Sequence, residues 1–62
     1  MSKLQQARLA KGLTREELSK LSGVSARTID KYENGEINIL KAAVGNMVAI
    51  ADALEVNVKD LI

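Results

Sequence analysis

The chain has 62 residues, a length that fits one small domain and leaves little room for an enclosed pocket. It contains no cysteine and no histidine, which excludes disulfides and thiolate metal sites and removes the commonest general base. The formal net charge is only +1. Composition therefore argues against an enzyme, and we expect no catalytic residue, no metal and no cofactor.

The first predicted helix covers residues 2–11. Leu4 and Ala7 share one face of it, and Gly12 stands where a left-handed C-terminal cap is expected. The segment "MSKLQQARLAKG" lacks the long apolar run of a signal peptide, and no stretch approaches the ~20 apolar residues of a membrane span. The absence of cysteine fits a reducing compartment. We therefore expect a cytoplasmic protein with no membrane partner.

The second predicted helix covers residues 14–21 and opens with "TREE", a capping box. In such a box the Thr14 hydroxyl accepts from the Glu17 amide while the Glu17 side chain reaches back. Leu18 and Leu21 are expected to form the buried stripe of this helix.

The third predicted helix covers residues 25–33, with Ser25 as its N-cap. Val24, in the turn before it, is expected to pack inward. Ile29 and Tyr32 mark its inner side, and "ENG" closes it.

The connector "EINILKAA" is expected to contain one tight helical turn after Asn38. A fourth helix follows over residues 42–54, and Asn57 is placed to cap a short fifth helix over residues 58–62. Five residues of the fourth helix are expected on or near the core: Val44, Met47, Val48, Ala51 and Leu54.

Apolar residues recur at three- and four-residue spacing along the chain, and proline is absent. The sequence therefore predicts an all-α fold, a compact five-helix single domain over residues 1–62. Its charge is uneven: residues 1–31 hold seven basic and three acidic side chains, whereas residues 32–62 hold two basic and five acidic ones. This distribution gives a polarised molecule, although charges on small helical proteins also scatter unevenly by chance.

The second and third helices are about two turns long and are joined by a tight turn that contains Gly23. Small residues, Ser19 and Ser22, allow the two helices to approach closely. This spacing is typical of a helix-turn-helix, whose second helix lies in the DNA major groove.

The free face of the third helix carries polar side chains suited to reading base edges. Arg27 can read guanine with its two-pronged guanidinium, worth about 1–3 kcal/mol of discrimination. Thr28 can form a hydrogen bond or contact a thymine methyl, whereas Ala26 can only contact the methyl. Lys31 can reach a base edge or a phosphate. Each is an ordinary surface residue when taken alone, so the prediction depends on their arrangement.

The segment "GLTREELSKLSGVSARTIDKYENG" resembles the helix-turn-helix of the phage repressor and Cro family, also called the Xre family. The matching features are "LT..EL", "GVS..TI" and "YENG", and the tail "IADALEVNVKDLI" is similar to the usual ending of the family. The resemblance runs from Leu4 to Leu61. It implies a lambda-repressor-like domain in a prokaryotic or phage-borne DNA-binding regulator.

The resemblance also implies roles for individual residues. Positions that face base edges or adjoining phosphates are Ser25, Ala26, Arg27, Thr28 and Lys31. Positions that contact the DNA backbone are Thr14, Arg15 and Asn34. Arg8 and Glu33 fall at positions that form an ion pair between the first helix and the end of the third. Glu36 departs from the family, many members of which carry Lys or Arg there.

We expect a transcriptional regulator that binds double-stranded DNA, a repressor acting as a homodimer on a palindromic operator. The antitoxin of a toxin–antitoxin pair, which would also bind a toxin or another regulatory protein, stays open. So does an adaptor that has lost DNA binding. An apolar cluster near the C-terminus is either a dimer contact or closes the core; its members are Val56, Val58, Leu61 and Ile62.

Overall fold

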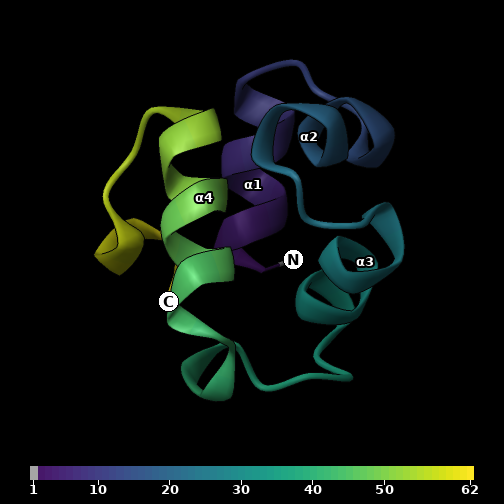
Figure 1. The fold of residues 1–62 in the computed structure, drawn as a ribbon. Helices are drawn as coiled ribbons and strands as arrows, with labels where there is room; N and C mark the ends of the chain where they lie inside the picture. The colour runs from purple at the N-terminus through teal and green to yellow at the C-terminus, as the bar shows by residue number, and fades with distance from the viewer. Residues whose placement is uncertain (1) are drawn as a thin grey trace.

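The computed structural model describes residues 2–62, which form four α-helices and two short 3-10 helices and contain no strand (Figure 1). The all-α prediction is confirmed. In chain order the elements are α1 (Lys3–Ala10), α2 (Arg15–Ser22), α3 (Ala26–Asn34), η1 (Ile39–Lys41), α4 (Val44–Leu54) and η2 (Val58–Leu61). None of these helices has the length and apolarity needed to cross a bilayer.

The helices pack around one another rather than in layers. Helix α2 packs against both α3 and α4, and α1 packs against α3 (Figure 1). The chain then returns at its C-terminal end, where η2 contacts α1 and α4. Helix α3 is thus fixed from one side by α1 and α2.

The core is built from one side of every helix. Leu4, Leu18, Ile29 and Ile50, one from each of α1 to α4, are each 0% exposed. The sequence prediction had missed Ile50. The other buried apolar residues are Val24, Tyr32, Met47, Ala51, Leu54 and Leu61.

Three residues that the sequence placed on or near the core are exposed instead. Leu21 is 63% exposed, because the inner face of α2 passes through Leu18 and the small residues beside it. Val44 is 77% and Val48 is 44% exposed. The buried face of α4 consists of Met47, Ile50, Ala51 and Leu54, which recur at three- and four-residue spacing. Val44 and Val48 lie outside this face.

Two predicted boundaries are corrected at the C-terminal half. The fourth helix begins at Val44 rather than at residue 42, because after η1 the backbone of Ala42 is extended and that of Ala43 is also not helical. The tight turn predicted after Asn38 is η1 itself. The predicted fifth helix is a 3-10 helix, since four residues are too few for more than one α-helical hydrogen bond.

Candidate nucleic-acid interface

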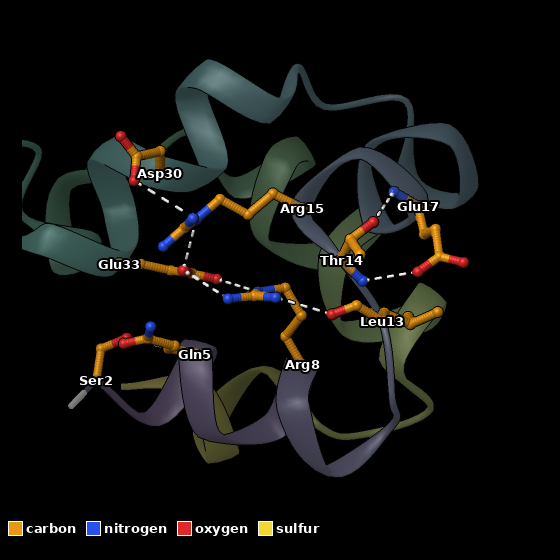
Figure 2. Close-up of polar contacts among 9 residues, drawn as sticks. All are labelled: Ser2, Gln5, Arg8, Leu13, Thr14, Arg15, Glu17, Asp30 and Glu33. Carbon is orange, nitrogen blue, oxygen red and sulfur yellow. Dashed lines mark hydrogen bonds and ion pairs between the residues drawn. The ribbon is translucent and has the colours of Figure 1, made fainter.

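The start of α2 is fixed by the predicted capping box. The Thr14 hydroxyl accepts a hydrogen bond from the Glu17 amide at 3.1 Å, and the Glu17 carboxylate accepts from the Thr14 amide at 2.8 Å (Figure 2). The bond from the Thr14 backbone, more than any other contact, lowers the pKa of Glu17 below its ordinary value. The box leaves the N-terminus of α2 well defined and exposed, where the helix dipole favours an anion.

The turn between α2 and α3 depends on Gly23, which has φ of 78° in the left-handed region that favours glycine. Val24 follows it and is 6% exposed, as predicted. Ser25 then caps α3: its hydroxyl accepts from the Thr28 amide at 3.1 Å and donates to the Thr28 hydroxyl at 2.8 Å. The Ser25 and Thr28 hydroxyls therefore have local partners already.

Helix α3 divides into an anchored and an open side. Ile29, Tyr32 and Glu33 are buried, and the Tyr32 hydroxyl accepts from the Asn46 amide at 3.1 Å. At 100° per residue, Arg27 and Lys31 lie nearly opposite Ile29. Within residues 2–62, the side chains of Arg27 and Lys31 form neither a hydrogen bond nor an ion pair.

The other predicted contact residues surround this open side. Ala26 and Thr28 are half-buried on the two flanks of α3, while Ser25 and Asn34 are exposed at its two ends. The side-chain oxygen of Asn34, Oδ1, accepts from the Glu36 backbone amide at 2.8 Å, which holds the chain in a turn after the helix. The five predicted base-reading residues thus lie within the first two turns of α3, with Arg27 and Lys31 on its open side and Ala26 and Thr28 on its flanks.

Arg8 and Glu33 lie in direct contact, as the resemblance implied. Arg8 Nε donates to Glu33 at 2.6 Å and Nη2 donates to the other carboxylate oxygen at 3.2 Å, while Nη1 donates to the Leu13 carbonyl at 2.8 Å (Figure 2). Their side chains are 7% and 1% exposed. This buried pair ties α1 to the end of α3.

Arg15 has partners that the sequence prediction missed. Its Nε donates to Glu33 at 2.9 Å and lies 3.4 Å from an Asp30 carboxylate oxygen (Figure 2). Arg15 was predicted as a phosphate contact only. The spacing of Asp30 and Glu33 was an available signal, because residues three apart share one side of a helix.

A second surface feature is an apolar groove of about 170 Å³ between η1, α4 and η2. It is lined by Ile39, Leu40, Ala42, Val44, Met47, Val48, Val58 and Ile62. Leu61, for which the sequence left open a dimer contact or a place in the core, is 2% exposed and belongs to the core of the chain. Val56 is half-buried against the same core. The exposed apolar surface is therefore centred on α4 and includes Val58 and Ile62 of the predicted cluster, but not Leu61 or Val56.

Comparison with known proteins agrees with this geometry. Residues 4–61 match a family model described as "Helix-turn-helix". Two uncharacterized HTH-type transcriptional regulators, from Rickettsia conorii and Rickettsia prowazekii, are each 39% identical over 56 residues, which is 90% of this chain. The chain spans 42% and 41% of the length of these two relatives.

A solved structure matches nearly the whole chain. It is the restriction-modification controller protein C.AhdI from Aeromonas hydrophila, with a TM-score of 0.85 and 32% sequence identity. The match covers 97% of this chain and 86% of that protein.

Proposed function

This chain belongs to the Helix-turn-helix family, and from that membership we propose that it is a sequence-specific regulator of transcription that binds double-stranded DNA. In this proposal α3 enters the major groove, and its first turn and outer side read base edges. The activity requires binding alone and no catalysis.

The observation that carries the proposal is the division of α3 into two sides. Its inner side is held by core packing and by the buried ion pair, so the helix has a fixed position. Its outer side presents Arg27 and Lys31 without partners among the described residues. Cations on a rigid helix fit direct reading of base edges in the major groove.

Backbone contacts would position this helix on the duplex. The N-terminus of α2 at Thr14 is exposed and its helix dipole favours a phosphate, and Asn34 lies at the other end of the motif. Contacts of this kind supply affinity and register, while α3 supplies sequence preference.

We further propose that the regulator acts as a homodimer on a near-palindromic operator. A single small module buries only about 600–1,000 Å² against DNA, which limits its affinity. Among residues 2–62, five of the seven exposed large apolar side chains line the groove around α4. A twofold dimer through this surface would present two copies of α3 to half-sites about 34–36 Å apart. Repression follows where the operator overlaps a promoter.

The likeness to C.AhdI favours a narrower second candidate, a controller of restriction-modification genes. The two chains match over most of both lengths, so the likeness is not limited to the helix-turn-helix. Expression of a reporter gene from the recovered operator, together with the position of that operator in the source genome, tests this candidate.

The decisive experiment is selection from random double-stranded DNA, followed by binding of the recovered site across a salt series. We expect an inverted repeat, and affinity that falls steeply with salt because phosphate contacts release counterions. Arg27→Ala should weaken binding by about 5- to 150-fold, the range of one good base contact. Lys20→Ala, a cation on α2, is the matched control.

Absence of any enriched sequence, with no binding even at low salt, would contradict the proposal. The chain would then be better described as a protein-binding adaptor on the same fold. Equal losses for Arg27→Ala and Lys20→Ala would contradict the assignment of α3 as the reading helix.

A further inference from the structure

Four charged side chains form one connected group where α1, α2 and α3 meet, which we call the four-residue cluster: Arg8, Arg15, Asp30 and Glu33. Glu33 accepts from both arginines, and Asp30 lies 3.4 Å from Arg15 (Figure 2). Two positive and two negative charges make the cluster formally neutral. Loss of Arg15 alone would leave it with one uncompensated negative charge.

The exposed edge of this cluster borders the side of α3 proposed to meet DNA. Asp30 follows Arg27 by three residues, so the two lie about 60° apart around the helix. The Asp30 side chain is 50% exposed and that of Arg15 is 38% exposed. Arg15 is also the first residue of α2, next to the N-terminus that would face a phosphate. A negative charge at this edge would oppose the DNA backbone.

We propose that Arg15 is a positioning residue for DNA binding: it holds and neutralises Asp30 at the edge of the reading helix instead of binding a phosphate. The proposal rests on the DNA-binding function proposed above. It changes the role of Arg15, which the family resemblance placed among the phosphate contacts.

The geometry favours carboxylate partners for Arg15 over a phosphate. Its Nε points between Glu33 at 2.9 Å and Asp30 at 3.4 Å. The Glu33 side chain is 1% exposed, so its attraction is screened by solvent and salt less than that of a phosphate in water. A phosphate would have to compete for Nε with a buried carboxylate that is already in place.

The test measures binding of the operator recovered by selection to Arg15→Gln, Asp30→Asn and the double variant. We expect Arg15→Gln to bind about tenfold more weakly, as one uncompensated like charge at the rim of an interface would cause. The double variant Arg15→Gln/Asp30→Asn should return to within about twofold of the original chain, since it restores neutrality. The salt dependence of Arg15→Gln should keep its slope, because no phosphate contact is lost.

A matched control separates the rescue by Asp30→Asn from a general gain in DNA affinity on removal of any acidic side chain. Glu36 is exposed and, within residues 2–62, has no ion-pair partner. The double variant Arg15→Gln/Glu36→Gln should therefore still bind the operator about fivefold more weakly than the original chain. All binding is measured below the unfolding transition of each variant, since Arg15 also contacts the buried Glu33.

Opposite results would overturn the inference. A phosphate contact predicts that the double variant with Asp30→Asn stays as weak as Arg15→Gln, and that the slope of log K against log salt falls by about 0.9. Unchanged binding by Arg15→Gln would also overturn it. Failure of the original chain to bind any DNA would instead contradict the proposed function. Binding by the original chain is the first measurement of the series, so the two failures are distinguished.

Discussion

At the scale of single residues, the two arginines that contact Glu33 differ in their surroundings and therefore in what they do. Arg8 is 5% exposed and gives three hydrogen bonds, two to Glu33 and one to the Leu13 carbonyl. Arg15 is partly open to solvent and shares its Nε between two carboxylates. Arg8 is a structural residue despite its charge, whereas removal of Arg15 still leaves Glu33 a buried partner.

Arg8→Ala should lower the free energy of unfolding by about 3 kcal/mol, because it strands the buried Glu33 carboxylate. We expect the lower end of the range for buried pairs, since Arg15 remains as a partner. Urea denaturation measures the change, and Lys3→Ala, an exposed cation of the same helix, is the control. Unchanged stability combined with weaker DNA binding would show that Arg8 acts on DNA instead.

At the scale of elements, backbone conformation distinguishes two glycines that look alike in the sequence. Gly23 ends α2 with φ of 78°, in the left-handed region, and so creates the turn of the helix-turn-helix. Gly45 lies inside α4, where a Cβ would meet nothing within 4 Å. The first glycine is required by the turn, while the second only lowers the helix propensity of α4.

Gly23→Ala and Gly45→Ala should therefore change stability in opposite directions. We expect Gly23→Ala to destabilise the chain by about 1–2 kcal/mol, the cost of the left-handed conformation for a residue with a Cβ. Gly45→Ala should stabilise it by up to about 1 kcal/mol, the difference in helix propensity. Thermal unfolding at low protein concentration measures both. Destabilisation by Gly45→Ala would mean that this face of α4 is in close contact with another helix.

At the scale of the whole molecule, the chain has two distinct surfaces. The outer side of α3, in the basic half of the sequence, carries the unpaired cations. The groove around α4 gathers exposed apolar side chains from η1, α4 and η2, all in the acidic half. These are the two surfaces that we propose for DNA and for a second copy of the chain.

Val44→Glu should convert the proposed dimer to a monomer and weaken operator binding, because it places a charge among the side chains that line the apolar groove. Its melting temperature should stay close to that of the original chain at low concentration, since Val44 is 77% exposed and an acid is favoured in the first turn of a helix. Leu21→Glu is the control: Leu21 is 63% exposed but lies outside the groove. Sedimentation velocity would contradict the prediction if both variants sediment alike.

The sequence by itself determined the features that depend on neighbouring residues. The all-α class, the helix-turn-helix and the caps at Thr14, Gly23 and Ser25 follow from signals that act within one helical turn. The bounds of α1, α2 and α3 were accordingly predicted to within one residue.

Only the tertiary structure decided which side chains meet across the fold. The resemblance implied the pair of Glu33 with Arg8, and the spacing of Asp30 and Glu33 placed both acids on one side of α3. Glu33 lies 18 residues from Arg15, however, so no local pattern could show that it holds both arginines. The same is true of Leu61 and Val44: both are apolar, but η2 folds back on α1 and α4 and buries the first, whereas nothing in residues 2–62 covers the second. Burial and ion pairing depend on what packs against a residue, and that is fixed only when distant segments come together.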